Sequence, residues 1–251
     1  MMEQPWQMFL NQRVSVNGQS DDGIVALEKP VGILSHPNGE LRASKAALFT
    51  CKYSLKFEKY VFDRENFAVY LLNRLDAPVS GLILVALNEE IAHAVKFALK
   101  ERTIEKKYLA LLKGHLPDKS GCWRSNIAKT KCKNCVRAEG SGNVAAVTKY
   151  RLMREFLWKN FTLSFVELQL LTGRTHQLRL HCSKNHVPIV GDRTYGDFNF
   201  NRQFYKLAGN DRLFLHSNEV DIHYQCGGKT RNFHAKSKCC FADHCLGALA
   251  Q

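Results

Sequence analysis

The chain has 251 residues, of which 45% are hydrophobic and 24% charged, a composition typical of a globular protein that buries a core without disulfide or metal support. Lys and Arg number 36 against 23 Asp and Glu, a formal net charge of +13. This balance favours a polyanionic partner, nucleic acid first and an anionic membrane surface second. No apolar stretch is long enough to cross a bilayer, and no secretory signal is visible. We therefore expect a cytoplasmic protein whose nine cysteines are reduced thiols.

The first part of the chain shows one clear element. Residues 1–21 are polar and weakly patterned, and we interpret them as an N-terminal tail or edge segment. A single domain is expected over residues 22–251, because no long linker interrupts them. The apolar segment Ile24–Leu27, which ends in a Lys-Pro step, predicts a strand followed by a turn. Residues 40–72 show no clean period, so no element is assigned there.

A strand and a helix are expected next. The continuous apolar run Gly81–Leu87 has the length of a strand that is buried on both faces. Apolar residues at helical spacing then predict a helix over residues 89–101. Asn88 is its expected cap, and two glutamates lie in its first turn, where acids suit the helix dipole. Residues 108–112 indicate another strand, which ends at Gly114.

The second half of the chain is expected to mix strands with two helices. Residues 117–143 are rich in Lys, Gly, Ser and Asn, and predict an exposed basic loop or hairpin. Two strands are expected over residues 144–152 and 161–171, and Thr175 can cap a helix that runs to about Lys184. Toward the C-terminus the pattern predicts a helix over residues 200–208 and a strand over residues 213–224.

The first group of polar residues with chemical potential is the stretch NRLDAPVSG, residues 73–81. It places Arg74 and Asp76 two positions apart on a loop that enters a buried strand, with a proline and a glycine that fix a tight backbone path. An acid held by such a loop at the margin of a sheet is well placed for catalysis. A turn with a surface ion pair is the alternative, and this stretch alone favours that alternative.

The second group is LTGRTHQLRLH, residues 171–181. A strand ends there and a helix begins, with two arginines, a histidine and a glutamine in close succession. So many polar side chains around two leucines are poor core material, and a site that binds anions or bases explains them better. A solvated amphipathic helix is the alternative.

These two groups, with the block KKYLALLKG between them, occur in an order that resembles the three motifs of the RluA-type pseudouridine synthases. The opening VALEKPVGILSHP and the later HVPIVGDRTYGDFNFNRQF and RLFLHS also look like blocks of that family, so the resemblance covers roughly residues 22–225. The GDRTYGDFNFNRQF stretch is most similar to the tRNA pseudouridine synthase C branch. The sequence departs from the family pattern at Asn73, where histidine is usual, and at Val79, where threonine is usual.

The resemblance implies catalytic roles for three residues. Asp76 matches the catalytic aspartate, Tyr108 matches the tyrosine that stacks on the flipped base and helps to remove its C5 proton, and Arg179 matches the arginine paired with the aspartate. The arginine beside the aspartate would contact RNA, and two leucines of the second group would wall the uracil pocket. The expected substrate-binding residues are Arg74, Arg174, His176, Gln177, Leu178 and Leu180.

The resemblance also implies an α+β pseudouridine synthase fold, with a long mixed and mostly antiparallel sheet, flanking helices and a central active-site cleft, over a catalytic domain of residues 22–251. Asp76, Tyr108 and Arg179 should converge in that cleft. The reaction needs a carboxylate that stays charged in an enclosed pocket. Burial favours the neutral carboxyl, and an adjacent arginine favours the charged form. No cofactor, metal or external group donor is required.

A uridine of a tRNA is the expected substrate and a uridine of rRNA is the alternative, with no membrane and no obligate protein partner indicated. Asn73 and Val79 support a second hypothesis, a catalytically inactive RNA-binding protein on the same fold. A third is a zinc-dependent RNA-binding module, because cysteines and histidines supply candidate ligands: Cys132, Cys135, Cys239, Cys240, His244 and Cys245, with His234 close by. Unliganded thiols are favoured over zinc, since the second half of this set lacks a standard spacing.

Overall fold

The computed structural model describes residues 5–62, 67–101, 103–132 and 135–243, and the side chains of residues 128–143 lie outside that description. The chain forms two compact units and passes between them three times. The single domain expected over residues 22–251 stays a prediction. No helix among the described residues is both long and apolar enough to cross a membrane. The first unit comprises Met1–Ile104 and Ser217–Lys238, and the second comprises Glu105–His216 and Cys239–Gln251.

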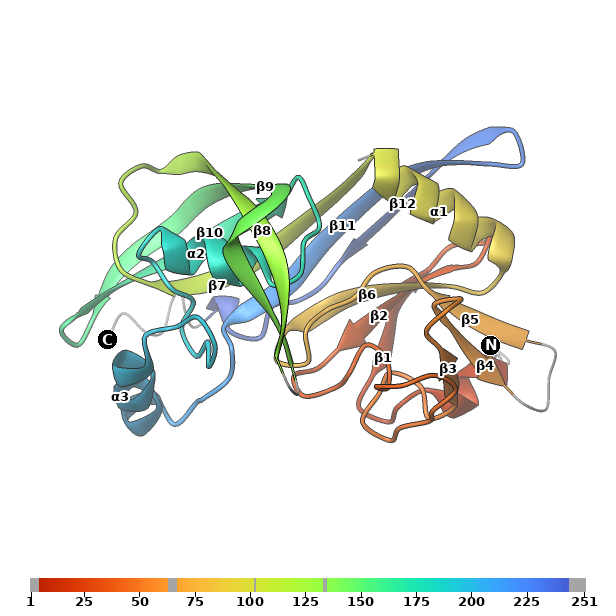
Figure 1. The fold of residues 1–251 in the computed structure, drawn as a ribbon, viewed down its shortest axis with the longest axis horizontal. Coiled ribbons are helices and arrows are strands. Elements are labelled where there is room, and N and C mark those ends of the chain that lie inside the picture. The colour runs from red at the N-terminus through yellow and green to blue at the C-terminus, as the bar shows by residue number, and fades with distance from the viewer. Residues whose placement is uncertain (1–4, 63–66, 102, 133–134, 244–251) are drawn as a thin grey trace. The chain divides into compact units, whose positions relative to one another are not determined.

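The first unit is built on strands that are hydrogen-bonded in the order β3-β4-β5-β6-β11 (Figure 1). Strand β2 also pairs with β6, β1 pairs with β2, and β12 pairs with β11. The pairs whose residue register is defined in this unit are antiparallel. Its elements are η1 (Pro5–Phe9), β1 (Ser15–Gln19), β2 (Ile24–Lys29), β3 (Lys52–Ser54), β4 (Lys59–Phe62), β5 (Phe67–Leu71), β6 (Ser80–Ala86), α1 (Glu89–Glu101), β11 (Leu215–Cys226) and β12 (Lys229–Lys236).

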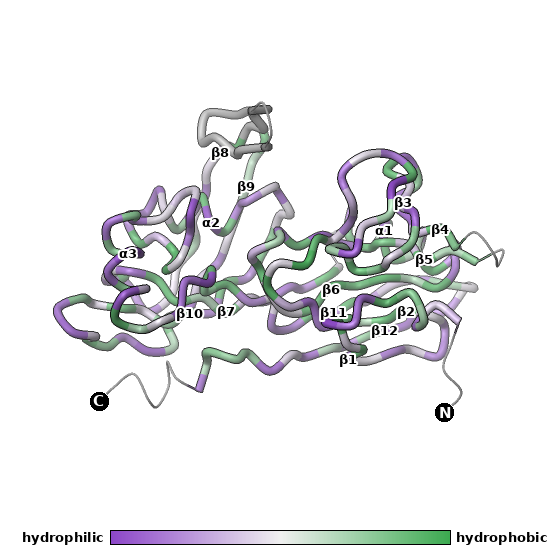
Figure 2. Tube along the Cα trace, turned by 90° about the horizontal axis from the view of Figure 1, so that it is seen from below, coloured by the Kyte–Doolittle hydropathy of each residue, from purple (hydrophilic) through white to green (hydrophobic). Residues whose placement is uncertain are grey.

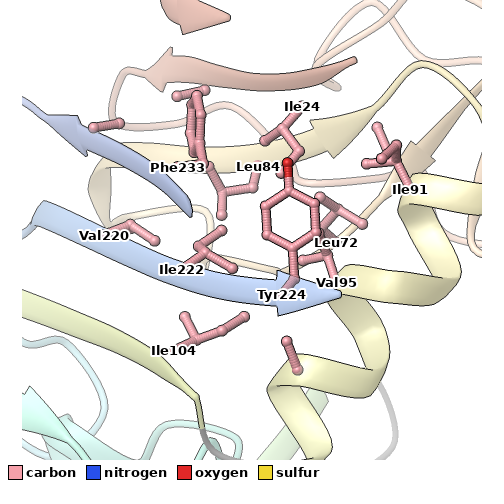
Figure 3. Packing of buried hydrophobic residues seen from close by; sticks show 14 of the residues in the cluster. Ile24, Leu72, Leu84, Ile91, Val95, Ile104, Val220, Ile222, Tyr224 and Phe233 are labelled. Carbon is pink, nitrogen blue, oxygen red and sulfur yellow. The ribbon is translucent and has the colours of Figure 1, made fainter. Parts of the chain in front are cut away.

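Strand β6 and helix α1 form the core of this unit. The expected strand buried on both faces is confirmed, since each of the seven residues of β6 is buried, and its tube is mostly green in Figure 2. The predicted helix is also confirmed, and Asn88 caps it by accepting a hydrogen bond at Oδ1 from the Ile91 amide at 2.9 Å. Ile91 and Val95 pack against strand side chains such as Leu84 and Ile222 (Figure 3). The apolar side of α1 therefore covers this part of the sheet.

The N-terminal segment and the unassigned region both contribute strands to the first unit. Strand β1 pairs with β2 alone among the described strands, so it lies at an edge. Trp6 of η1 is buried against Phe49, with ring centres 6.2 Å apart. Strands β3, β4 and β5 occupy the region over residues 40–72, and at three to five residues each they are too short for a period to show.

The second unit contains strands in the order β7-β10-β9-β8, joined by antiparallel pairings. The basic stretch over residues 117–143 falls in the hairpin of β8 and β9, which confirms the hairpin alternative. Strand β9 also takes in the strand expected over residues 144–152. The elements are β7 (Ile104–Lys113), β8 (Ser120–Cys132), β9 (Cys135–Trp158), β10 (Phe161–Leu170), α2 (Gln177–Lys184) and α3 (Phe198–Ala208).

Helix α3 packs an aromatic face onto the second unit. Asp197 caps it by accepting a hydrogen bond from the Phe200 amide at 2.9 Å, and Gly209 ends it in the left-handed region. Phe200 and Phe204 are buried, and Phe204 lies 4.8 Å from the ring of Trp158. With α1 and α3 packed on antiparallel strands, the predicted α+β class with a mostly antiparallel sheet is confirmed.

The predicted cap of α2 is wrong. The helix begins at Gln177, and His176, not Thr175, occupies the N-cap, with φ 54° and no side-chain cap. The reason is that the preceding turn is fixed from elsewhere. The Thr172 hydroxyl accepts a hydrogen bond from the Val147 amide at 2.9 Å, which anchors the turn to β9.

Candidate active site

Asp76 lies on the loop between β5 and β6 of the first unit, half-buried, beside the exposed Arg74. The loop turns tightly there, because the Val79 amide donates to the Asp76 carbonyl at 3.0 Å. Ser35 holds the residue before the aspartate from both sides. Its hydroxyl donates to the Leu75 carbonyl at 2.6 Å and accepts from the Leu75 amide at 2.9 Å. The backbone on each side of Asp76 is therefore fixed.

Lys29 holds the same loop by hydrogen bonds to backbone carbonyls. Its side chain is 0% exposed. Its ammonium donates to the carbonyls of Pro30 at 3.1 Å, Ile33 at 2.8 Å and Ala77 at 3.2 Å. The Ala77 carbonyl also accepts from the Gly32 amide at 2.8 Å. A buried charge is tolerated when its hydrogen bonds are made, so the Lys-Pro step of β2 ties the aspartate loop to the start of the chain.

The strand that follows explains two more residues of the motif. Gly81 has φ +104°, and a Cβ there would lie 2.2 Å from the Ser217 carbonyl oxygen, so only glycine fits. Asn73, where the family usually has histidine, accepts a hydrogen bond from the Leu84 amide at 2.7 Å. The asparagine at this position therefore joins the loop to β6. Val79 is buried at 3% exposure.

Arg179 lies in the second unit and forms a buried ion pair with Asp192. Its Nε and Nη2 each donate to an Asp192 oxygen at 2.8 Å, and the two side chains are 6% and 1% exposed. Asp192 also accepts from the amides of Thr194 at 2.8 Å and Tyr195 at 3.0 Å. Burial would raise the pKa of Asp192, but the hydrogen bond and charge of Arg179, with these two amides, hold it below its usual value.

The block GDRTYG shapes the surroundings of this pair. A Cβ on Gly191 would lie 1.8 Å from the Arg212 carbonyl oxygen, and one on Gly196 would lie 2.2 Å from that of Asp192. The ring of Tyr195 lies 5.2 Å from the Arg179 guanidinium. Sequence reasoning missed Asp192 as the partner of Arg179. The available signal was an acid placed between two glycines in a block that resembled the family.

Gln177, predicted to bind substrate, is 2% exposed and makes its hydrogen bonds inside the second unit. Its Nε2 donates to the Val147 carbonyl and the Thr148 hydroxyl, each at 3.0 Å. Its Oε1 accepts from the Thr172 hydroxyl at 2.7 Å and the Arg174 amide at 3.1 Å. These bonds fix the turn before α2 against β9, which is a positioning role.

His181 extends this network. Its Nδ1 lies 2.9 Å from the Thr148 hydroxyl and its Nε2 lies 2.8 Å from the Ser125 hydroxyl. Burial, with a contribution from the charge of Lys184, lowers the pKa of His181 to about 4. The imidazole is therefore neutral at pH 7.

The other predicted substrate residues differ in exposure. His176 is half-buried and its Nδ1 lies 3.0 Å from the Tyr195 hydroxyl. Arg174 is exposed, with its Nε 3.4 Å from the Ala145 carbonyl oxygen. Leu178 and Leu180 are buried, and Leu180 belongs to a small apolar cluster that Tyr195 also touches. Some side chains of residues 172–181 are thus buried and support the fold, while others lie at the surface.

The three predicted catalytic residues belong to different units. Asp76 lies in the first unit, while Tyr108 and Arg179 lie in the second. Tyr108 is buried in β7, opposite Leu168 of β10. The convergence of the three residues in a central cleft stays a prediction.

The zinc hypothesis has little support in the described part of the chain, where no group of three His, Cys, Asp or Glu side chains could hold a metal ion. Cys239 is buried, and Cys240 is exposed and accepts a hydrogen bond from Arg212. Other candidate ligands lie outside the described side chains: Cys132, Cys135, His244 and Cys245.

The RNA pseudouridylate synthase family matches residues 23–184, which is more than half of the chain. The chain belongs to this family. The match includes the Asp76 loop, the KKYLALLKG strand and the TGRTHQLRLH segment. The resemblance on which the sequence-based expectations depended is therefore confirmed.

Relatives within the family carry names of both RNA classes. The chain is 31% identical to tRNA pseudouridine synthase C of Haemophilus ducreyi over 205 residues, 78% of this chain and 80% of the relative. It is 29% identical to the enzyme of the same name from Pectobacterium carotovorum, over 86% of this chain but 57% of the relative. Ribosomal large subunit pseudouridine synthase C of Rickettsia bellii is 29% identical over 86% of this chain and 66% of its own length. The chain thus spans little more than half of the length of some relatives, 57% for the Pectobacterium enzyme.

Two solved human structures share the fold. RNA pseudouridylate synthase domain containing 1 superposes with a TM-score of 0.62 at 24% identity, over 95% of each chain. RNA pseudouridylate synthase domain containing 4 superposes with a TM-score of 0.63 at 21% identity, over 97% of this chain and 94% of the other. These likenesses confirm the predicted pseudouridine synthase fold.

Proposed function

We propose that the chain isomerises a uridine of an RNA to pseudouridine in the cytoplasm, with Asp76 as the essential catalytic residue. One observation carries the proposal. Asp76 lies on a loop of the family's first motif, and the backbone of that loop is held by Ser35 at Leu75 and by the buried Lys29 at Ala77. A clamped loop holds its carboxylate in one position, which catalysis by positioning requires.

The chemistry suits such a site. Isomerisation breaks the glycosidic C–N bond and forms a C–C bond within one nucleotide, so no electron or group donor is consumed. Asp76 attacks or deprotonates the nucleotide, and Arg179 keeps the carboxylate charged. Asp192 accepts hydrogen bonds from Nε and Nη2 of Arg179 and so fixes the orientation of its guanidinium. Tyr108 stacks on the flipped uracil, which returns about 1–3 kcal/mol of the cost of flipping.

We infer that tRNA is the substrate class. Two relatives named tRNA pseudouridine synthase C support this choice, as does the net charge of +13, which suits a phosphate backbone. An rRNA substrate is the alternative, and the Rickettsia relative supports it. A pseudouridine map of total RNA with and without the gene separates the two. Loss of a tRNA site supports our choice, and loss of an rRNA site alone rejects it.

The activity is tested by tritium release from RNA labelled at uridine C5. Wild-type protein is expected to release tritium, and Asp76→Asn should abolish release while RNA binding is retained, because the amide has the shape of the carboxylate without its charge. Equal release by the variant would reject the role of Asp76. A wild-type protein that binds RNA and releases no tritium from any cellular RNA would instead support the inactive RNA-binding hypothesis.

A further inference from the structure

In the first unit, a turn of four residues, 55–58, joins β3 to β4, both labelled in Figure 1. This turn carries an exposed aromatic side chain. The ring of Phe57 is 55% exposed at the tip of this turn. Two ammonium groups lie near the ring, with Nζ of Lys56 at 5.1 Å and Nζ of Lys59 at 5.5 Å from its centre. The tip therefore combines a solvent-facing aromatic surface with two positive charges.

The turn is ordered before any ligand arrives. The Glu40 carboxylate accepts hydrogen bonds from the Ser54 hydroxyl at 2.7 Å and from the amides of Leu55 at 2.7 Å and Lys56 at 3.3 Å. The hydrogen bond from Ser54, more than any other contact, lowers the pKa of Glu40. Because the backbone is already fixed, little conformational entropy is lost when the exposed ring binds a partner.

The charge at the tip is positive. Two carboxylates lie at the turn: Glu58, whose Oε2 lies 2.9 Å from Nζ of Lys96 on α1, and Glu40, which faces Lys56. Four lysines outnumber these two acids: Lys52, Lys56, Lys59 and Lys96. Lys52 and Lys56 are exposed and Lys59 is half-buried. A planar aromatic face flanked by ammonium groups fits unpaired nucleotides, since a base stacks on the ring while the phosphates meet the positive charges.

The hairpin is linked to the loop of Asp76 through Ser35. The Tyr60 hydroxyl in β4 donates to the Ser35 carbonyl at 2.8 Å, and the Ser35 side chain holds Leu75. Tyr60 lies three residues after Phe57 in the same hairpin. Arg74 acts on the same hairpin, because its charge opposes the burial that raises the pKa of Tyr53 in β3. An RNA bound over Asp76 and Arg74 would thus have its flanking nucleotides near this tip.

We propose that Phe57 stacks on an unpaired base that flanks the target uridine, and that Lys56 contacts the adjacent phosphate. This inference rests on the proposed function, since it takes the RNA to be the substrate. The incoming base replaces a lysine ammonium over the ring, and the displaced ammonium meets the phosphate. The hairpin tip is therefore a binding surface separate from the residues that carry out the reaction.

The test measures binding of bulk tRNA at several salt concentrations. Phe57→Ala should weaken binding about fivefold or more at every salt concentration and leave the salt slope unchanged, because stacking releases no counterions. Lys56→Gln should reduce the slope of log Kd against log salt by about 0.7–0.9, the value for one lost phosphate contact. Phe198→Ala is the matched control, since Phe198 is 57% exposed in the second unit. It should bind within about twofold of wild type.

Conservative replacement separates stacking from damage to the turn. Phe57→Tyr should bind like wild type, and both Phe57 variants should unfold at the wild-type temperature. In tritium release, Phe57→Ala should raise KM and leave kcat unchanged. Wild-type affinity in Phe57→Ala, with an equal salt slope in Lys56→Gln, would overturn the proposal and leave the tip as a surface for a protein partner. If wild-type protein binds tRNA but never releases tritium, the proposed function fails while this binding series still decides the role of Phe57.

Discussion

The loop that carries Asp76 and the segment that carries Arg179 are held in place in opposite ways. In the first unit, Lys29 and Ser35 bind the carbonyls and amides of the aspartate loop. In the second unit, the arginine segment is held mainly through its own side chains, with Gln177 bound to β9 and Arg179 bound to Asp192. The aspartate loop is therefore held mainly by residues outside its motif, whereas the 172–181 segment is held by side chains of the motif itself.

This difference changes how each motif should be interpreted. The backbone of the aspartate loop is fixed by residues forty or more positions earlier, Ser35 and Lys29, and the Asn73 side chain adds one bond to β6. The polar side chains of the 172–181 segment looked like ligands for a substrate, yet the most buried of them hold the protein together. Substitutions in the first motif should therefore affect activity more than stability, and substitutions in the second should affect both.

The largest effect is expected from breaking the buried pair of the second unit. Asp192→Asn removes the carboxylate that pairs with the buried Arg179 guanidinium, and should lower the free energy of unfolding by about 3–5 kcal/mol. Urea unfolding measures it. Asp211→Asn is the control, because the Arg193–Asp211 pair is mostly exposed, and should change stability by less than about 1 kcal/mol. Similar values for the two variants would show that side chains do not hold this segment.

The next effect is a dependence of stability on pH in the same unit. The pKa of His181 is about 4 in the folded protein and about 6.5 in the unfolded chain. Between these values the unfolded chain binds a proton that the folded protein does not, so stability is complete above pH 6.5 and is lost as the pH falls toward 4. The free energy of unfolding, measured with urea at pH 7 and pH 4, should therefore differ between the two pH values by about 3 kcal/mol less in His181→Gln than in the wild type.

His216 is a second source of the same pH dependence. It is buried, and burial with a contribution from Arg212 lowers its pKa to about 4 as well. His181→Gln alone should therefore leave part of the pH dependence, and adding His216→Gln should remove more. His93→Gln, at an exposed position of α1, should leave the wild-type curve unchanged. An unaltered curve in the double variant would contradict the assignment.

A smaller loss of stability with a larger loss of activity is expected in the first unit. Lys29→Met keeps the apolar stem and removes the donor to three carbonyls, one of them next to Asp76. We expect about 2 kcal/mol of destabilisation, together with a fall in kcat for tritium release at saturating RNA. Lys45→Met, at an exposed position, should change neither. A stable Lys29→Met protein with wild-type kcat would show that the backbone clamp is dispensable.

The smallest effect is expected at Asn73. Asn73→Ala removes the acceptor for the Leu84 amide, and should cost about 1 kcal/mol of stability with little change in kcat. Thermal unfolding and tritium release measure the two quantities. Asn73→His restores the residue that the family pattern usually has, and should retain activity. A tenfold fall in kcat for Asn73→Ala would place this residue in the chemistry instead.

Local patterns were sufficient for several elements. The continuous apolar run gave β6, and helical spacing with an Asn cap gave α1, because the signal for each lies within a few consecutive residues. Short strands escaped detection, since β3 and β4 have three and four residues. The cap of α2 was misplaced because hydrogen bonds from β9, distant in the sequence, fix the turn before it.

The sequence by itself determined the family, the mostly antiparallel α+β class and the position of the candidate catalytic aspartate, because ordered motifs and periodic burial are written into neighbouring residues. Only the tertiary structure decided which side chains support the motifs. Asp192 meets Arg179 across 13 residues and Lys29 reaches the Ala77 carbonyl across 48. Such partners leave no local period, since they are brought together by the packing of whole strands.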